Sequence, residues 1–474
     1  MNPFVAMSLS LILERAKQFI VENGLDSLPV WLRRDPEQFE IIYNYPLAND
    51  MRVLPLNSGL PSFKRANPTG VYVHVPFCAG TCSYCHYTRT ELRSLPQIDS
   101  FLNSLLMEMA LWSQVLPEGF GKQIQTVFIG GGTPTAMSSH QIERLAKGLI
   151  QIFGIRDVSC LREYTWEASP ETLVDSRVEK LHVLRGLGVN RLSMGVQSFE
   201  PRLIELCGRK HTAEQAEEAY QLAGNAGFSN INMDFIYGLP TQTLQDWANT
   251  LETIARVRPQ SVSIHQLRVK SGTRIYDMSR RHLPSDDVRI TMLAMAHVVL
   301  RDSGYIAIEN DAFVLAPEYD HQHQKDKWVR FNDLLGVGPA AYGYLDDTTY
   351  FNHLDEPGYR LAIDGKRLPI WRAKRLTLTE RKARALVMGL AFYDGVSKQL
   401  YESLFQETVD VTFGPLISLL QSERLIETVG DSIRLTMKGG FFSPEVRRRF
   451  FLSKNSGADC PSGSYFRDFA FVKG

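Results

Sequence analysis

The stretch VYVHVPFCAGTCSYC, residues 71–85, joins a run of β-branched and aromatic residues directly to three closely spaced cysteines. The run 71–77 has the composition of a β-strand. Cys78, Cys82 and Cys85 follow it with the spacing C-x3-C-x2-C. Because the loops after the strands of a βα barrel form its catalytic face, we expect the three cysteines to lie at that face.

The chain continues from this stretch as an alternation of short apolar runs and helix-like segments. Strands are predicted over 71–77, 126–131, 164–169, 191–198, 231–238 and 261–267. Helices are predicted over 97–114, 138–153, 177–187, 213–227 and 244–257. Successive strand–helix units predict a parallel sheet with covering helices. Six units are too few to close the common eight-stranded barrel, so the predicted fold is α/β, an open, partial (β/α)6 barrel.

Three cysteines suit a cubane 4Fe–4S cluster, because they leave one of its four irons without a protein ligand. That iron can bind an amine and a carboxylate, a pair that S-adenosylmethionine (SAM) carries. An electron from the cluster can then break the C5′–S bond of SAM and give a 5′-deoxyadenosyl radical, while the protein positions the parts. The alternative is a zinc site that also uses His74 or His86. A second Cys/Cys or Cys/His pair is absent from the sequence, and the spacing is not that of a zinc site.

The composition excludes several classes of protein. The 474 residues include 52 basic and 52 acidic side chains, a balance that favours neither nucleic acid nor an anionic membrane. No apolar run reaches the length of a membrane span. The start lacks the basic region and cleavage site of a signal peptide, so we expect a cytoplasmic protein, and a monomer. Six cysteines are too few for a disulfide framework, and Cys160, Cys207 and Cys460 are expected to be small buried side chains.

Five regions are predicted. An N-terminal helical extension, 1–70, contains an amphipathic helix whose apolar face carries Leu9, Ile12, Leu13, Ala16 and Ile20. The core barrel follows at 71–267, then an accessory region packed on the barrel at 268–370, a winged-helix-like α+β domain at 371–452, and a tail at 453–474. The winged-helix pattern, with a Gly-Asp turn between two strands, lacks a strong basic stripe. We therefore favour a packing or substrate-lid role over DNA binding.

Further motifs follow the cysteines in a recognisable order: FIGGGTPT (128–135), WEASPETL (166–173), RLSMGVQSF (191–199), MDFIYGLPTQT (233–243) and DLLGVGPAAYG (333–343). With the cysteine segment they make residues 70–345 resemble the radical SAM superfamily, and within it the oxygen-independent coproporphyrinogen III oxidase-like proteins. The resemblance implies a 4Fe–4S cluster, one or two molecules of SAM, a small organic substrate, and a flavodoxin or ferredoxin as electron donor.

The resemblance also implies contacts to SAM near the cluster. Gly131, Gly132 and Thr133 are expected to meet its amino acid end, because glycines let the backbone approach a ligand closely. Tyr84, between two cysteines, is expected beside the adenine, and Tyr72 is expected to contact SAM from the first strand. The alternatives are a tight turn for the glycines and simple packing for the two tyrosines.

The remaining expected contacts come from later motifs. Glu167 is expected to bind the ribose or amine, unless it is a surface carboxylate or part of a salt bridge. Gln197, Arg209 and Asp234 match positions that line a second SAM site in the oxidases; an Arg can grip a carboxylate with two hydrogen bonds. Tyr342 matches a weaker SAM contact, and an apolar packing role for it is an equal alternative.

The chain departs from the oxidases and from haem-chaperone relatives at specific positions. Tyr87 stands where the oxidases have a fourth cysteine, and their N-terminal R-Y-T-S-Y-P-T stretch is absent. In HQHQKDKW (321–328), where the chaperones have H-N-x-x-Y-W, Gln324 and Lys327 replace the Asn and Tyr. We therefore expect a divergent member resembling the class C methyltransferases and cyclopropanases, which transfer a one-carbon group with two SAM molecules. Coproporphyrinogen decarboxylation, a haem chaperone and other radical chemistry are the alternatives.

Three histidines are open to two interpretations. His321 and His323, near acidic residues, could bind haem or a metal or transfer protons, or they could belong to a solvated polar loop, which we favour. His265, near the end of the sixth strand, faces either the catalytic side or the core, and the core is favoured.

Overall fold

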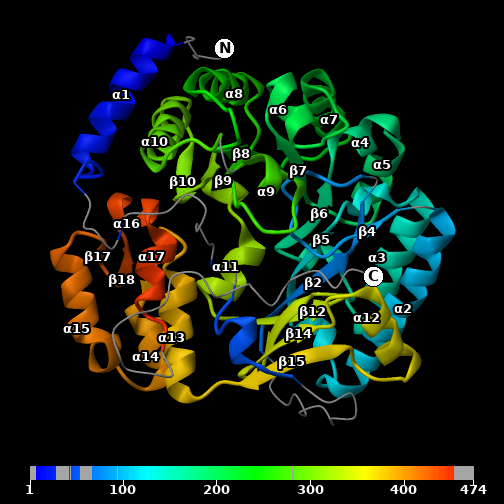
Figure 1. The fold of residues 1–474 in the computed structure, drawn as a ribbon. Helices are drawn as coiled ribbons and strands as arrows, with labels where there is room; N and C mark the ends of the chain where they lie inside the picture. Colours follow the sequence, from blue (N-terminus) through cyan, green and yellow to red (C-terminus); the bar gives the residue numbers. More distant parts are fainter. Residues whose placement is uncertain are drawn as a thin grey trace.

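The computed structural model describes residues 7–27, 32, 42, 44–53, 67–78, 80–92, 94–176, 178–279 and 282–452. The predicted tail 453–474, Cys460 and much of the predicted extension 1–70 lie outside these ranges. A single sheet organises most of the chain, with strand order β1-β15-β14-β13-β12-β2-β5-β6-β7-β8-β9-β11-β10 (Figure 1).

Six parallel strands form the centre of this sheet, as predicted. They are β2 (Thr69–Val75), β5 (Ile124–Gly131), β6 (Glu163–Ala168), β7 (Arg191–Gln197), β8 (Ile231–Tyr237) and β9 (Ser261–Gln266). The helices between them are α2 (Leu95–Val115), α3 (Ser139–Phe153), α4 (Pro170–Asp175), α5 (Glu179–Gly186), α6 (Pro201–Leu206), α7 (Ala213–Asn225) and α8 (Leu244–Val257). Reciprocal capping boxes at Ser138, Thr212 and Thr243 fix the starts of α3, α7 and α8.

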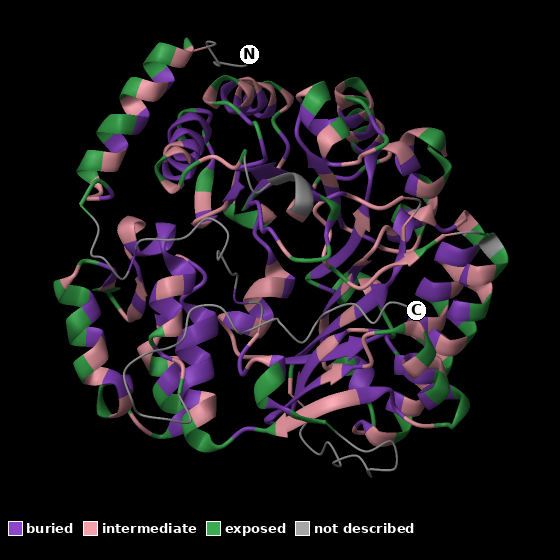
Figure 2. Ribbon diagram, viewed as in Figure 1, coloured by how far each residue is buried: buried purple, intermediate pink, exposed green. Residues whose placement is uncertain are grey.

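Side chains alternate along each central strand, so the sheet has one apolar and one polar face. In β2, Val71, Val73 and Val75 are fully buried. Tyr72 and His74 lie on the opposite face, where successive residues of a strand must point. The same period places polar residues of β6 to β9 on that face, which lines the barrel interior, or lumen. Figure 2 shows these strands largely buried beneath the surrounding helices.

The region 268–370 differs from its prediction, because its strands extend the sheet itself. β12 (Asp333–Val337) runs parallel to β2, and antiparallel strands follow: β13 (Tyr342–Leu345), β14 (Thr348–Asn352), β15 (Ile370–Arg375) and β1 (Arg52–Val53). At the other edge β11 (Ala312–Val314) pairs with β9, and β10 (Ile306–Glu309) follows. The predicted boundary at 370 falls on the first residue of β15, so the large sheet ends only at Arg375.

The C-terminal domain is separate from this sheet and has its own three strands, ordered β16-β18-β17. Its elements are α13 (Leu378–Gly389), β16 (Val396–Ser397), α14 (Lys398–Phe405), α15 (Val409–Ser422), β17 (Ile426–Val429), β18 (Ser432–Leu435), α16 (Met437–Phe441) and α17 (Ser443–Arg448). The β17–β18 hairpin turns at Gly430, whose φ of 57° lies in the left-handed region. The arrangement matches the winged-helix pattern of the sequence.

The remaining helices are α1 (Leu9–Glu22), α9 (Arg274–Ser279), α10 (Asp286–Asp302), α11 (Gln322–Trp328) and α12 (Glu356–Asp364). α1 packs along α10, with Ile12 and Ala16 fully buried, so the predicted amphipathic helix is present (Figure 1). Phe19 of α1 stacks on His297 of α10, with ring centroids 5.6 Å apart. In the described part of the chain, no helix is long and apolar enough to cross a membrane.

Candidate active site

The three cysteines lie in the loop that leaves β2 at the carboxyl edge of the barrel. Cys78 ends the short strand β3 (Phe77–Cys78), which pairs with β4 (Thr90–Glu91). Between Cys82 and Cys85, Ser83 binds the end of α6: its N–H donates to Cys207 O (2.9 Å) and its Oγ to Leu206 O (2.6 Å). The loop is therefore fixed to both β2 and the β7–α6 unit.

The surroundings of the thiols suit iron–sulfur ligation. Cys78, Cys82 and Cys85 are free and partly exposed. Arg209 Nη1 donates to Cys82 Sγ (3.4 Å) and Thr133 Oγ1 to Cys78 Sγ (3.9 Å), contacts that favour thiolates. Within the described ranges, no three His, Cys, Asp or Glu side chains are close enough to share one metal ion. A cubane gives each thiolate its own iron, so the residues fit a cluster better than the single zinc ion of the alternative.

The glycine loop after β5 packs tightly against this segment. Gly132 N donates to Val75 O (2.8 Å) and Thr133 N to Phe77 O (2.7 Å). Gly131 has a φ of 115°, and a Cβ there would lie 2.7 Å from the His74 ring. Its N–H donates to Glu167 Oε2 (2.8 Å), which places Glu167 in the lumen and not on the surface. Burial raises the pKa of Glu167 to about 7.

Tyr72 reaches the same part of the lumen through His74, a residue that the sequence indicated only as a zinc alternative. The Tyr72 hydroxyl lies 2.9 Å from His74 Nδ1, and His74 Nε2 lies 3.1 Å from Thr88 O. Both ring nitrogens are thus engaged, and burial lowers the pKa of His74 to about 4. A neutral His74 therefore contacts both the Tyr72 hydroxyl and the glycine loop at Gly131 and holds them in place.

The lumen also brings together Gln197 of β7, Asp234 of β8 and Arg209 from the loop that follows α6. Arg209 Nη2 donates to Gly195 O (2.7 Å), and Gly195 is paired with Asp234 in the sheet. A β-bulge follows Gly195 and gives Gln197 a φ of 74°. The structure therefore brings the three expected second-SAM residues together, although Arg209 and Asp234 are held by contacts within the protein.

The two other predicted tyrosines differ in position, because Tyr84 lies near Arg209 and Cys82 whereas Tyr342 belongs to β13. Tyr84 packs on an apolar cluster that includes Leu203, Cys207 and Ile236. Tyr342, at the start of β13, packs against Phe351 with ring centroids 5.2 Å apart. The Tyr342 hydroxyl is buried without a hydrogen-bond partner among the described residues.

The predictions for the other cysteines and histidines need three corrections. Cys207 is buried as expected, but Cys160 is exposed, because it follows a short surface turn at Asp157. His265 is not a core residue: its side chain is 48% exposed and faces the lumen. His321 and His323 are not in a solvated loop, since their exposed fractions are 9% and 3%.

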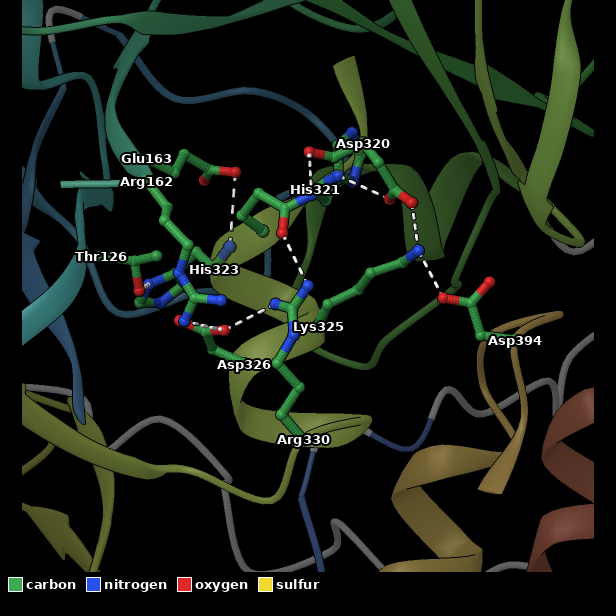
Figure 3. Close-up of polar contacts among 11 residues, drawn as sticks. Thr126, Arg162, Glu163, Asp320, His321, His323, Lys325, Asp326, Arg330 and Asp394 are labelled. Atoms are coloured by element: carbon green, nitrogen blue, oxygen red, sulfur yellow. Dashed lines mark hydrogen bonds and ion pairs between the residues drawn. The ribbon is translucent and has the colours of Figure 1, made fainter. Parts of the chain in front are cut away.

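Helix α11, which His321 caps and which contains His323, closes the amino-terminal end of the barrel. His323 Nδ1 lies 2.9 Å from Thr126 Oγ1 of β5, and its N–H donates to Glu163 Oε2 of β6 (3.3 Å). Figure 3 shows His323 directed toward Thr126, with Lys325 between Asp320 and Asp394. These residues lie at the opposite end of the strands from the cysteines, where they fill the end of the barrel and have a structural role.

Buried Glu108 of α2 is a residue that sequence reasoning missed. It accepts hydrogen bonds from the hydroxyl of Tyr359 (2.6 Å), Gly338 N (2.8 Å), Asn352 Nδ2 (2.8 Å) and Trp112 Nε1 (3.3 Å). These contacts join α2 to the loop that precedes Tyr342. Burial outweighs the four donors and raises the pKa of Glu108 from 4.5 to about 7.

This carboxyl group gives a prediction for stability against pH. Between about pH 4.5 and pH 7 the folded protein holds a proton on Glu108 that the unfolded chain releases, so the free energy of unfolding falls as pH rises. Glu108→Gln cannot lose that proton. Relative to wild type it should gain about 3 kcal/mol from pH 4.5 to 7. Melting temperatures of both proteins across this range test the prediction, and a constant difference between them would contradict it.

Comparison with known proteins gives the family. Residues 72–254 match the model of the radical SAM superfamily, and residues 376–442 match the HemN C-terminal domain. The heme chaperone HemW of Bacillus subtilis is 30% identical over 378 residues, covering 79% of this chain and 97% of the relative. This chain belongs to the radical SAM superfamily, in the family of HemW and the coproporphyrinogen III oxidases. The cofactors of this radical SAM protein are therefore a 4Fe–4S cluster and SAM.

Two oxidase comparisons agree with this assignment. The oxygen-independent coproporphyrinogen III oxidase of Escherichia coli is 28% identical over 397 residues, covering 78% of this chain and 83% of the relative. The structure of the Escherichia coli coproporphyrinogen III oxidase HemN matches with a TM-score of 0.71 and 25% identity, covering 81% of this chain and 90% of that one. These relatives favour the oxidase and chaperone alternatives over the methyl transfer expected from the sequence.

Proposed function

We propose that this radical SAM protein acts on a tetrapyrrole, the class of molecule that its relatives oxidise or chaperone. The supporting observation is the carboxyl edge of the barrel, where Cys82, Gly131, Glu167 and Arg209 gather above a polar lumen. When bound, a 4Fe–4S cluster held by Cys78, Cys82 and Cys85 would supply the electron for reductive cleavage of SAM and so the means to remove hydrogen from carbon.

The chain's own residues bind and orient in this proposal. Cys78, Cys82 and Cys85 would hold three irons of the cluster, and Arg209 keeps a positive charge beside Cys82. Glu167 accepts a hydrogen bond from Gly131 and so fixes the glycine loop, whose backbone would bind the amino acid end of SAM in this proposal. Without these fixed contacts, the cluster and SAM would have to find their productive relative orientation again at each turnover.

The test is anaerobic turnover of the full chain with dithionite, SAM and coproporphyrinogen III or haem, in separate reactions. We expect 5′-deoxyadenosine from SAM, with at least about tenfold stimulation by one tetrapyrrole, since positioning of the acceptor governs productive cleavage. Mass spectrometry of the nucleoside and of the tetrapyrrole measures it. Equal 5′-deoxyadenosine formation with and without either tetrapyrrole would overturn the proposal.

A haem chaperone is a second candidate, because the HemW relative is covered over 97% of its length. A chaperone would bind haem with a shifted Soret band but would leave SAM cleavage slow. Methyl transfer would instead release S-adenosylhomocysteine, and the grouping of Gln197, Arg209 and Asp234 keeps that outcome open to the same assay. A flavodoxin or ferredoxin is the proposed electron donor, and replacing dithionite with either protein tests that role.

A further inference from the structure

Both terminal nitrogens of the Arg209 guanidinium group are committed to contacts within the protein. Nη1 donates to Cys82 Sγ (3.4 Å), and Nη2 donates to Gly195 O (2.7 Å). An arginine grips a carboxylate with two parallel N–H groups, so in this position Arg209 offers less to the carboxylate of a second SAM than the sequence predicted. Its guanidinium group is directed instead at the sulfur of a cluster ligand.

The backbone around Arg209 fixes its distance from Cys82. Ser83 N donates to Cys207 O (2.9 Å) and so joins the cysteine loop to the loop that carries Arg209. Gly208, with a φ of 69°, lies against the cysteine loop, where an added Cβ would be 3.6 Å from Cys82 Cα. The two loops therefore meet backbone to backbone, and the contact between the guanidinium group and the sulfur follows from the fold.

His211 ties the same segment to the next carbonyl of β7. Its Nε2 lies 3.1 Å from Val196 O, and because a carbonyl oxygen only accepts, this nitrogen carries the hydrogen. Its Nδ1 lies 3.4 Å from Glu171 Oε2, and none of the His211 side chain is exposed. Arg209 and His211 therefore bind successive carbonyls next to the bulge at the end of β7. The end of this strand holds the guanidinium group and the imidazole together.

A permanent positive charge beside Cys82 favours reduction of a cluster bound there. The guanidinium group of an arginine stays protonated in proteins, so its charge does not change with pH. Reduction adds one electron to a 4Fe–4S cluster, and a nearby cation stabilises the reduced form more than the oxidised form. Hydrogen bonds to the ligand sulfurs are among the factors that set such potentials. Thr133, by comparison, offers an uncharged hydroxyl to Cys78 Sγ, at 3.9 Å.

We propose that Arg209 sets the reduction potential of the cluster through its contact with Cys82, and that His211 is the residue that positions it. Arg209 then acts on the first step of radical SAM chemistry, the transfer of one electron from the donor to the cluster. The inference goes beyond the proposed function and does not depend on the tetrapyrrole, because the electron enters before any carbon of a substrate reacts.

The test is an anaerobic redox titration of the reconstituted full-length protein with dithionite, in which EPR measures the reduced cluster. Arg209→Gln should lower the midpoint potential by at least about 59 mV, a tenfold change in the equilibrium constant of a one-electron couple. Arg209→Lys keeps the charge and should recover more than half of that change. Arg202→Gln is the matched control: it removes a positive charge from α6 that is 52% exposed and paired with Asp246, so it should keep the wild-type potential.

The positioning role of His211 has its own readout. His211→Leu removes the bond to Val196 O and should lower the potential by less than Arg209→Gln does, because the charge of Arg209 stays nearby but is held less firmly. In the double variant the potential should equal that of Arg209→Gln alone, since His211 acts through Arg209. A further fall in the double variant would overturn the role given to His211.

A measurement on the unsubstituted protein keeps the proposal falsifiable if Arg209→Gln fails to fold or to hold the cluster. Wild-type protein with nitrogen-15 in the guanidinium groups of its arginines should show coupling of this nitrogen to the reduced cluster in pulsed EPR, and Arg209→Lys should lose it. No coupling in the wild type, or coupling that persists in Arg209→Lys, would overturn the proposal.

The SAM contact that the sequence predicted for Arg209 gives a different result in the same variants. An unchanged potential in Arg209→Gln, with SAM bound at least about tenfold more weakly, would overturn the proposal in favour of that contact. A lowered potential with wild-type SAM affinity would support the proposal. In either case the tetrapyrrole proposal is judged separately, by stimulated SAM cleavage in excess dithionite.

Discussion

Replacing Cys82 by alanine is expected to abolish cluster binding and, with it, SAM cleavage. Cys78 and Cys85 alone would leave two irons without protein ligands instead of one. The change also removes the sulfur that accepts the hydrogen bond from Arg209 (3.4 Å) and leaves that guanidinium beside an empty position. We expect at least about a 100-fold loss of 5′-deoxyadenosine formation. Loss of a residue that only contacts a metal ligand can already cost about 100-fold, and Cys82 is a ligand itself.

Cys207 provides a demanding control for this prediction. It is fully buried next to the cysteine loop, and its carbonyl accepts the Ser83 N–H. Cys207→Ala should keep wild-type iron and sulfide content after anaerobic reconstitution, because its thiol belongs to an apolar cluster. Cys160→Ala, at the surface, should do the same. If Cys82→Ala retained the cluster, or if Cys207→Ala lost it, the assignment of the three ligands would be wrong.

The six-stranded core was predictable because its signals are local. The strand over 191–198 was expected and β7 spans Arg191–Gln197, since apolar residues facing the helices recur with period two. The α8 prediction, 244–257, agrees with Leu244–Val257, because Thr243 and Asp246 form a capping box within four residues. The cysteine loop and the glycine loop are equally compact motifs. Each is contained in one short stretch of sequence, so each could be recognised from that stretch alone.

Long-range partners account for most of what the sequence did not predict. Glu108 meets Gly338 and Asn352 across more than 200 residues, and no local pattern links them. His265 alternates along its strand with buried apolar residues. The same alternation would occur if the face of His265 lined a solvent-filled lumen or a packed core, so the sequence could not show whether that face is buried. The polar run around His323 suggested solvent exposure, but Arg162 and Arg330 neutralise Asp326 and allow the helix to be buried.

Gly132→Ala is the second change from which a large effect is expected, since it forces backbone against backbone. A Cβ at Gly132 would lie 2.4 Å from Phe77 O and 2.8 Å from Phe77 C. Phe77 precedes Cys78 and accepts the Thr133 N–H, so neither side of the contact can move without disturbing the cluster segment. We expect the glycine loop to be displaced, SAM to bind at least about tenfold more weakly, and the melting temperature to fall, as for other overpacked sites.

Gly224→Ala is the matched control, because nothing lies within 4 Å of the Cβ that it would add on α7. Alanine is favoured over glycine inside a helix by about 1 kcal/mol, so this variant should melt at or above the wild-type temperature and bind SAM normally. Equilibrium dialysis with SAM and thermal unfolding separate the two effects. Wild-type SAM affinity in Gly132→Ala, with an unchanged melting temperature, would show that the loop tolerates a side chain and that its contact with Phe77 does not position the cofactor.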